Sequence, residues 1–284
     1  LHSLSAALEM IQFEHTIFAL PFAFMGAVLA ARGLPPWSRT VCVLLAMVGA
    51  RSAAMTFNRL VDQPYDARNP RTAHRPLVTG SLSRRFAWVF LLAASGLFVA
   101  AAALLNRLTL ALSLPVLGLV LGYSYAKRFT WATHFLLGAA LGCAPLGAWI
   151  AVRGEIDLAP SILGLAVLCW TAGFDIIYSC QDAEFDREAD LHSIPRRWGI
   201  PMALSFARGL HFLMVLGLLG VGRLLSLGTL FHLAIAGTAA LLIYEHSLVR
   251  ANDLSRVNRA FFTVNGYVSV FLFLMTLADL RWRL

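Results

Sequence analysis

Long apolar stretches alternate with short polar segments along the whole chain. Nine such stretches approach the ~20 residues that a helix needs to cross the apolar core of a bilayer. They cover residues 13–31, 41–58, 86–105, 108–125, 134–152, 160–178, 203–222, 226–244 and 260–280. The runs are continuous and lack the alternation of a membrane β-barrel, and lipid cannot satisfy free backbone N–H and C=O groups. We therefore expect an all-α fold with nine transmembrane helices in a bundle.

The composition also indicates a membrane protein. Of the 284 residues, 59% are hydrophobic and 13% are charged, whereas soluble domains carry about 25% charged residues. A large soluble core, the alternative, does not account for this deficit. Few residues remain outside the apolar stretches, so we expect residues 1–284 to form a single integral-membrane domain.

Basic residues are distributed unevenly between two sets of loops. The loops 59–85, 126–133, 179–202 and 245–259, with the helix ends out to Arg208, contain 15 Lys and Arg, and the remaining loops and the C-terminus contain seven. Loops rich in Lys and Arg stay on the cytoplasmic side of a membrane. This rule predicts that the first set is cytoplasmic, and it explains the net charge of +8 without nucleic-acid binding.

A regularly spaced polar cluster follows the second apolar stretch, in NRLVDQPYDARNPRTAHRPLVTG. Asn58, Asp62 and Asp66 are spaced four residues apart, which puts them on one face of a helix. Pro64 lies inside this series, and proline kinks or ends a helix. We therefore expect the helix to end or bend between Arg59 and Pro64, with Asp66 on the following turn.

A second acidic cluster repeats this period after the sixth apolar stretch, in DIIYSCQDAEFDREADLHSIPRRWG, where Asp182, Asp186 and Asp190 are again four residues apart. Two such clusters on one side of the membrane would form an oxygen-rich site. Mg²⁺ prefers such a site, because it takes one or two carboxylates and completes its shell with phosphate oxygens and water. A solvated helix end explains either cluster alone, but carboxylates crowded together favour a cation between them.

Basic and aromatic side chains lie in the same predicted loops. RTAHRPL contains Arg71 and Arg75, and GYSYAKRFT contains Tyr123, Lys127 and Arg128. The arginine fork matches phosphate oxygens, and lysine adds a point charge. These residues are candidates for binding a diphosphate, and loop charge that only sets the topology is the alternative interpretation.

The order of these motifs resembles that of the UbiA superfamily of intramembrane prenyltransferases. Asn-x3-Asp-x3-Asp, RTAHRPL, YSYAKR and a DxxxD after DIIY follow one another in family order, and the resemblance covers nearly the whole chain. It implies a helix bundle around a central cavity, in which Mg²⁺ ions bind a polyprenyl diphosphate. The resemblance implies that the metal ligands are Asn58, Asp62, Asp66, Asp182 and Asp186, with Asp190 as an extension of the second motif. It also implies that Lys127 contacts the diphosphate and that Tyr123 contacts the allylic carbon.

Two classes of small aromatic acceptor are compatible with the resemblance. The chain is similar to 4-hydroxybenzoate polyprenyltransferases and to enzymes of the futalosine route to menaquinone, whose acceptor is of the aminodeoxyfutalosine type. FEHTIFALPFAF and LHSIP resemble the second branch, and His15 and Thr16 stand where ubiquinone-type enzymes carry an Arg-Pro-like pair. Arg51 lies within a predicted span, seven residues before Asn58. With His15, Arg51 is a candidate for binding an acceptor carboxylate, and a structural role in the bundle is the alternative.

An ion-coupled transporter is the alternative from another functional class, because acidic residues within membranes often mark ion paths. The carboxylates cluster near helix ends on one side, and no inverted repeat is recognisable, so the sequence favours an enzyme. We expect an integral protein of the bacterial cell membrane with its acidic motifs on the cytoplasmic side of the lipid bilayer.

Overall fold

The computed structural model describes residues 9–11 and 16–282. Its main elements are α2 (Thr16–Ala31), α3 (Trp37–Asp66), α4 (Pro76–Thr79), α5 (Arg84–Leu105), α6 (Arg107–Gly122), the 3-10 helix η2 (Tyr123–Arg128), α7 (Thr133–Arg153), α8 (Leu158–Ser179), the 3-10 turn η3 (Cys180–Asp182), α9 (Ala183–Glu188), α10 (Ile194–Leu224), α11 (Thr229–Ser247), the π-helix η4 (Arg259–Val264) and α12 (Asn265–Trp282). These described residues form no strand beyond one isolated bridge between Arg250 and Asp253. The predicted all-α fold is confirmed.

Each of the nine predicted apolar stretches overlaps one long helix in the described part of the chain. Seven helices within these residues are long and apolar enough to cross a membrane, and Phe18–Ala31 is apolar but shorter. α11, with 19 residues, is not among the seven. The polytopic architecture therefore agrees with the sequence, and the count of nine spans stays a prediction.

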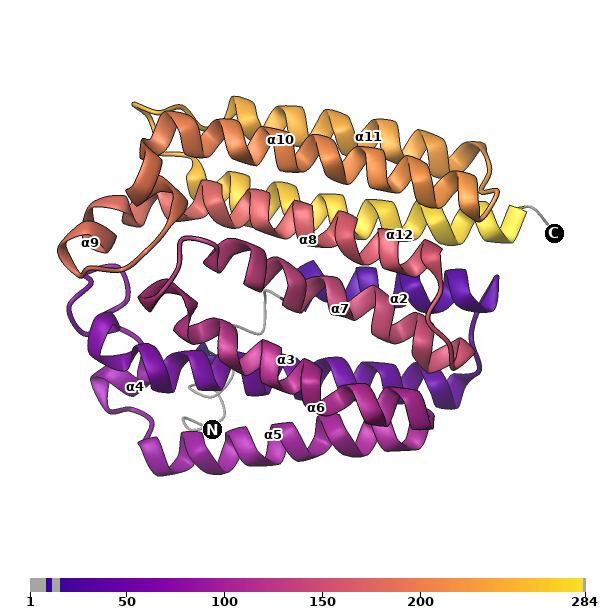
Figure 1. Ribbon diagram of the computed structural model, residues 1–284, viewed down its shortest axis with the longest axis horizontal. Coiled ribbons are helices and arrows are strands. Elements are labelled where there is room, and N and C mark those ends of the chain that lie inside the picture. Colours follow the sequence, from indigo (N-terminus) through magenta and orange to yellow (C-terminus); the bar gives the residue numbers. More distant parts are fainter. Residues whose placement is uncertain (1–8, 12–15, 283–284) are drawn as a thin grey trace.

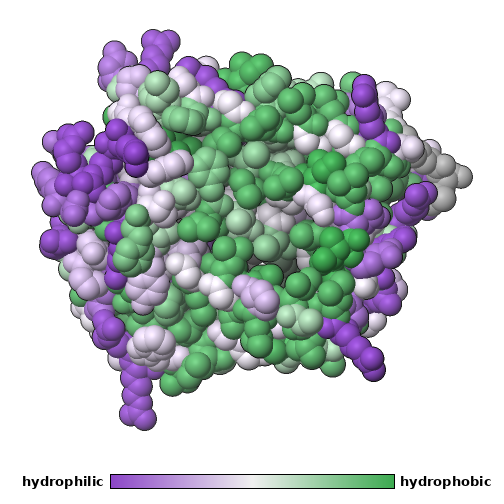
Figure 2. All heavy atoms as spheres, viewed as in Figure 1, coloured by the Kyte–Doolittle hydropathy of each residue, from purple (hydrophilic) through white to green (hydrophobic). Residues whose placement is uncertain are grey.

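The long helices lie side by side with roughly parallel axes (Figure 1). On the face shown in Figure 2, hydrophobic side chains form a broad band across the middle of the molecule, and hydrophilic side chains gather at its two ends. Large apolar side chains that are more than half exposed include Leu92, Leu104, Leu114, Leu165 and Phe212. An apolar belt between polar ends is the surface that a bilayer requires, and the chain is an integral membrane protein.

α7 and α8 touch through their backbones. A Cβ atom added at Gly142 would lie 2.5 Å from the carbonyl oxygen of Gly164, and one added at Gly138 would lie 2.5 Å from that of Leu168. Small residues allow membrane helices to approach this closely. The contact fixes the start of α7 relative to the end of α8, and both of these points lie beside the polar motifs.

A buried polar network joins α8, α11 and the start of α12. Trp170 Nε1 donates to Asn265 Oδ1 over 2.7 Å, and Asn265 Nδ2 donates to Glu245 Oε1 over 2.7 Å. The same amide nitrogen lies 3.1 Å and 3.2 Å from the carbonyl oxygens of Ala260 and Phe261 in η4. Trp170, Glu245 and Asn265 are each 0% exposed. The network thus holds η4 in place, and with it the ring of Phe261.

α6 lies at the edge of the bundle. Of its 16 residues, only Ser113 and Val120 are buried, and Leu114 is 65% exposed. The opposite side of the helix, with Leu112 and Val116, lines an apolar cavity. α6 therefore separates this cavity from the surrounding lipid.

The predicted end of the helix before Pro64 is wrong, because α3 includes Pro64 and ends at Asp66; the alternative, a bend at this point, stays a prediction. Proline removes the hydrogen bond that its N–H would have made to the carbonyl one turn earlier, and its ring crowds that carbonyl. The next turn is intact, since the N–H groups of Ala67 and Asn69 donate to the carbonyls of Gln63 and Tyr65 over 3.1 Å. Asp66 consequently stays on the same helix as Asn58 and Asp62.

Candidate active site

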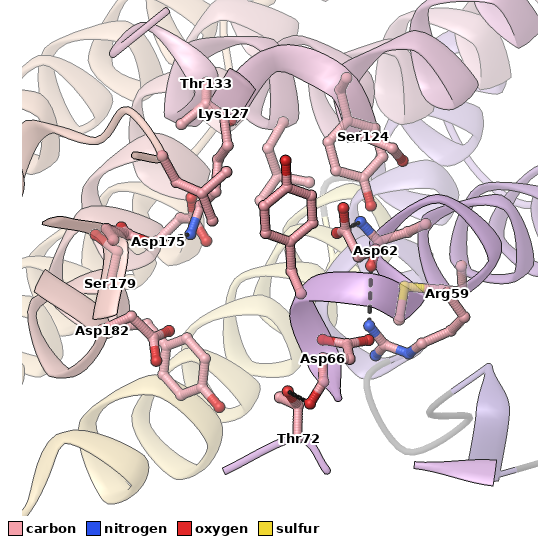
Figure 3. Close-up of a pocket in the computed structure, with 18 of the residues that line it drawn as sticks. Arg59, Asp62, Asp66, Thr72, Ser124, Lys127, Thr133, Asp175, Ser179 and Asp182 are labelled. Atoms are coloured by element: carbon pink, nitrogen blue, oxygen red, sulfur yellow. Dashed lines mark hydrogen bonds and ion pairs between the residues drawn. The ribbon is translucent and has the colours of Figure 1, made fainter. Parts of the chain in front are cut away.

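A cavity of about 280 Å³ lies at the end of the bundle where the polar motifs meet. Figure 3 shows Asp62 and Asp66 on one side of this space and Asp175 and Asp182 on the other. The sequence-predicted site residues that line it are Arg51, Asn58, Asp62, Asp66, Arg71, Arg75, Tyr123, Lys127, Arg128, Asp182 and Asp186. The four sequence motifs therefore converge on one cavity.

The first acidic motif projects into the cavity from the last two turns of α3. Asn58 Nδ2 donates to Asp62 Oδ2 over 2.9 Å. Arg75 Nη1 donates to both carboxylate oxygens of Asp66, each over 2.6 Å. Arg128 lies in η2, and its Nη2 is 3.5 Å from Asp62 Oδ1. Each carboxylate of this motif thus contacts a guanidinium from a different segment of the chain.

The second acidic motif begins at Asp182, where the chain leaves α8 through η3. Arg71 meets it with both arms of its guanidinium: Nε lies 3.1 Å from Asp182 Oδ1, and Nη2 lies 2.7 Å from Oδ2. Arg71 Nη1 also donates to the Tyr178 hydroxyl over 3.1 Å. Partial burial disfavours the charge on Arg71, but the contact with Asp182 outweighs it and raises the pKa of the guanidinium. The predicted approach of loops 59–85 and 179–202 is confirmed.

Asp186 and Asp190 lie in different surroundings despite their regular spacing. The Asp186 side chain is 1% exposed, and Lys127 Nζ lies 3.7 Å from its Oδ1. Asp190 is 87% exposed and pairs with Arg196 at 2.7 Å, a hydrogen bond that lowers the pKa of Asp190. Asp190 is not among the residues that line the cavity, because α9 ends at Glu188 and a positive φ of 54° at Asp190 turns the chain out of the helix.

A second, apolar cavity of about 370 Å³ adjoins the first. Residues from α3, α6 and α7 line it. The residues shared by the two cavities are Arg51, Met55, Tyr123, Leu137 and Leu141. Arg51 and Tyr123 thus lie where the polar space meets the apolar one, whereas His15 lies outside the described residues.

The donor set fits a divalent cation that binds together with a phosphate group. Asp186 Oδ2 is buried and has no hydrogen-bond partner, so an oxygen ligand is available in the cavity. Within residues 9–11 and 16–282, no three His, Cys, Asp or Glu side chains come close enough to hold an ion by themselves. Basic side chains lie against the carboxylates of both motifs. Mg²⁺ takes one or two carboxylates and leaves its other positions to phosphate oxygens and water.

Several lining residues were not among the predicted site residues. Arg59 is 5% exposed and donates to Asn58 Oδ1 over 2.8 Å. Tyr178 and Asp175 lie on the last turns of α8, in the DIIY element that preceded the recognised motif. The sequence contained a signal for both: Asp175, Tyr178 and Asp182 are three to four residues apart and so share one face of a helix. An acidic residue within an apolar helix is also costly unless it has a partner.

The fold and the convergent polar motifs define a membrane-embedded helix bundle with an acid–base site at one end. Residues 19–273 match the UbiA prenyltransferase family, and the chain therefore belongs to this family of prenyl-transferring enzymes. It is 31% identical over 255 residues to the 4-hydroxybenzoate octaprenyltransferase of Pseudomonas aeruginosa strain LESB58, covering 90% of this chain and 86% of that protein. It is 34% identical over 259 residues to the 4-hydroxybenzoate octaprenyltransferase of Aromatoleum aromaticum, covering 88% and 85%.

Solved structures have the same fold. The apo structure of a UbiA homolog from Aeropyrum pernix K1 superposes with a TM-score of 0.85 at 36% identity, covering 94% of this chain and 98% of that one. A UbiA homolog from Archaeoglobus fulgidus, bound to GPP and Mg²⁺, superposes with a TM-score of 0.76 at 22% identity, covering 97% and 99%.

Proposed function

We propose that the protein transfers a polyprenyl group from a polyprenyl diphosphate to a 4-hydroxybenzoate-like aromatic acceptor, with Mg²⁺ as cofactor. The observation that carries the proposal is the junction of two cavities of opposite character. The polar cavity suits a metal-bound diphosphate, and the adjoining apolar cavity suits a hydrocarbon tail. A polyprenyl diphosphate has both parts in one molecule.

The metal would be held by carboxylates from both acidic motifs. Asp62 and Asp66 would hold one ion and Asp182 and Asp186 another, with phosphate oxygens and water completing each shell. Asn58 supports the first pair through its hydrogen bond to Asp62. A metal held by these carboxylates would neutralise the charge that develops on the departing diphosphate. The Archaeoglobus fulgidus homolog, which binds GPP together with Mg²⁺, supports this cofactor.

The basic side chains bind the diphosphate oxygens. Arg71, Arg75, Lys127 and Arg128 come from two separate segments and reach the same cavity as the acidic motifs. Guanidinium forks and the lysine ammonium stabilise the phosphate charge in a space that is partly shielded from water. These residues therefore lower the energy of the transition state in which the bond between the prenyl carbon and oxygen breaks.

Aromatic rings surround the position of the allylic carbon. Phe18, Phe174, Tyr178 and Phe261 line the polar cavity, and the rings of Tyr178 and Phe261 lie 4.1 Å apart between centroids. Ring faces stabilise a nearby cation, and their bulk keeps water away from it. The electron-rich acceptor ring is then the nucleophile that reaches the allylic carbon.

Arg51 is the proposed partner of the acceptor carboxylate, and Tyr123 lies beside it at the junction of the cavities. A buried carboxylate needs a cation or a hydrogen-bond donor, and 4-hydroxybenzoate carries one. The names of the bacterial relatives support this acceptor. An acceptor of the aminodeoxyfutalosine type is the alternative, favoured by FEHTIFALPFAF and LHSIP in the sequence.

The location that we propose is the cytoplasmic membrane of a bacterium, with the polar cavity on the cytoplasmic side. The excess of Lys and Arg in the loops beside that cavity supports this orientation. A soluble acceptor would then enter from the cytoplasm, and the prenyl donor would enter from the lipid.

The test is a transfer assay with purified protein in lipid nanodiscs, one polyprenyl diphosphate, Mg²⁺ and a panel of aromatic acceptors. We expect prenylated 4-hydroxybenzoate by mass spectrometry, with equal amounts of diphosphate released and no product after chelation of the metal. Asp186→Asn should reduce the rate by about 10²-fold, while the exposed Asp190→Asn serves as a matched control with a wild-type rate. Prenylation of a futalosine-type acceptor alone would correct the substrate, and absence of product with every aromatic acceptor would refute the function.

A further inference from the structure

An arginine and two tryptophans lie together outside the cavity, in the loops before α7 and at the start of α10. The guanidinium carbon of Arg197 is 4.9 Å from the ring centroid of Trp198 and 5.8 Å from that of Trp131. The two indole rings are 4.9 Å apart between centroids and meet edge to face, at 79°. Arg197 is exposed, and Trp198 is 38% exposed. We call these three residues the Arg–Trp cluster.

The side-chain donors of Arg197 are not used within the described part of the chain. Its neighbour Arg196 donates to Asp190 Oδ1 and to the carbonyl oxygen of Leu191, each over 2.7 Å. In residues 9–11 and 16–282, no ion pair includes Arg197. A guanidinium over an aromatic ring keeps its N–H groups at the edge, where they match the oxygens of a phosphate. The cluster therefore presents a cation to which an anion from outside the protein can bind.

The turn that carries Arg197 is anchored on its buried side. Ile194 is 0% exposed, and its N–H donates to His134 Nε2 over 3.4 Å. The other ring nitrogen of His134, Nδ1, lies 2.6 Å from Asp175 Oδ2 in the wall of the polar cavity. Trp131 packs against the same group of buried apolar residues as Ile194. The Arg–Trp cluster thus has a fixed position on the outer side of the cavity wall.

A break in α10 brings the Arg–Trp cluster next to a part of that helix that faces lipid. Gly199 has φ 80° and ψ 162°, a conformation that residues with a Cβ atom rarely adopt. The rings of Trp198 and Phe206 lie 5.6 Å apart between centroids, although eight residues span about 12 Å along an unbroken helix. The glycine therefore lets Trp198 contact the outer face of the long part of α10.

This outer face is a continuous exposed stripe on a helix at the edge of the bundle (Figure 1). Its members are Met202, Phe206, Gly209, Leu213 and Leu216, all exposed and spaced three or four residues apart, so they share one side of the helix. A Cβ atom added at Gly209 would meet no atom within 4 Å, so the middle of the stripe is open. The stripe extends about 21 Å, which exceeds the ~15 Å of hydrocarbon in one leaflet.

We propose that the Arg–Trp cluster and this stripe bind an anionic phospholipid, with the phosphate at Arg197 and an acyl chain along α10. Tryptophan is typical of the level of the lipid headgroups, and basic side chains at that level bind anionic headgroups. The contact between Trp198 and Phe206 joins the charged and apolar parts of the site, so one lipid molecule reaches both. Phosphatidylglycerol fits better than phosphatidylcholine, because the choline cation would lie beside Arg197.

The experiment compares wild type, Arg197→Gln and Arg187→Gln in nanodiscs of phosphatidylcholine with and without phosphatidylglycerol. Arg187 is the matched control: it is exposed and lies in the same 179–202 loop, and within the described residues it lies over no aromatic ring. We expect native mass spectra of the wild type to show retained phosphatidylglycerol. The ratio of lipid-bound to lipid-free protein should be about tenfold lower in Arg197→Gln, as expected for loss of a charged hydrogen bond, and unchanged in Arg187→Gln.

Melting temperatures in the same nanodiscs separate lipid binding from a loss of folding. Phosphatidylglycerol should raise the melting temperature of the wild type and of Arg187→Gln but not that of Arg197→Gln, because a ligand of the native state stabilises it. In phosphatidylcholine alone the three proteins should melt together, and a lower value for Arg197→Gln there would assign Arg197 a structural role and overturn the proposal.

Two further outcomes would also overturn it. Equal lipid retention in wild type and Arg197→Gln, or an equal loss in Arg187→Gln, would mean that general surface charge attracts the lipid. Inorganic phosphate added to phosphatidylcholine nanodiscs should affect wild type and Arg197→Gln alike, since a free phosphate has no acyl chain to contact α10. A phosphate effect that requires Arg197 would assign the cluster to a free anion instead of a lipid.

Discussion

Replacing Asn265 by Leu should destabilise the bundle, because the new side chain keeps the branching of asparagine but has no polar atoms. The substitution removes the acceptor of the Trp170 Nε1–H and one donor to Glu245, and both partners are 0% exposed. Leaving a buried polar group without a partner costs about 1–3 kcal/mol, while hydrogen bonds between membrane helices average about 0.6 kcal/mol. Because neither orphaned group can reach water or lipid headgroups, we expect a loss near the upper range, about 3 kcal/mol.

The assay is equilibrium unfolding in mixed micelles, with the exposed Asn252→Leu as the control for loss of an amide. A second variant, Trp170→Phe, removes the donor of the hydrogen bond between Trp170 and Asn265. If the two residues act through this bond, the double variant should lose less free energy than the two single variants added together. A loss for Asn265→Leu below about 0.6 kcal/mol, the membrane average for one bond, or strict additivity with Trp170→Phe, would refute the reasoning.

Three further predictions concern the site and the packing around it. Asp182→Ala should reduce turnover by about 10²-fold or more in a protein that is still folded, and a rate near that of wild type would argue against a metal site. Arg51→Leu should raise the KM for the acceptor much more than the KM for the prenyl diphosphate; equal effects on both in steady-state kinetics would assign Arg51 a structural role. Gly142→Ala should lower the melting temperature of the protein, because the new methyl would meet the Gly164 carbonyl at 2.5 Å, whereas Gly147→Ala, with no neighbour within 4 Å, should leave it unchanged.

Hydrophobic runs predicted the helices well because a membrane span must be apolar along its whole length. The same pattern could not predict where the helices end in the polar motifs. Pro64 was expected to end or bend α3, yet the helix continues through it to Asp66, only two residues further on. Asp182, Asp186 and Asp190 are four residues apart, but the helix does not continue to Asp190. The backbone has a positive φ there and leaves the helix.

The convergence of the site was predictable only in part. The motifs with Asp62, Asp182 and Lys127 were recognised as components of one site, because their residue types suit a metal and a diphosphate. The pair of His134 and Asp175 was not, since its members are 41 residues apart and each lies in an apolar stretch. They come together where α7 packs against α8.

The position of α6 makes the enzyme sensitive to the physical state of the membrane. This helix is one wall of the apolar cavity and buries few of its own residues. Lateral pressure and acyl-chain length therefore act on the cavity directly, because the neighbours that hold the outer face of α6 are lipid chains. Thicker or more ordered bilayers should press α6 inward and narrow the space for the prenyl tail, so turnover should vary with lipid composition even when the polar residues are unchanged.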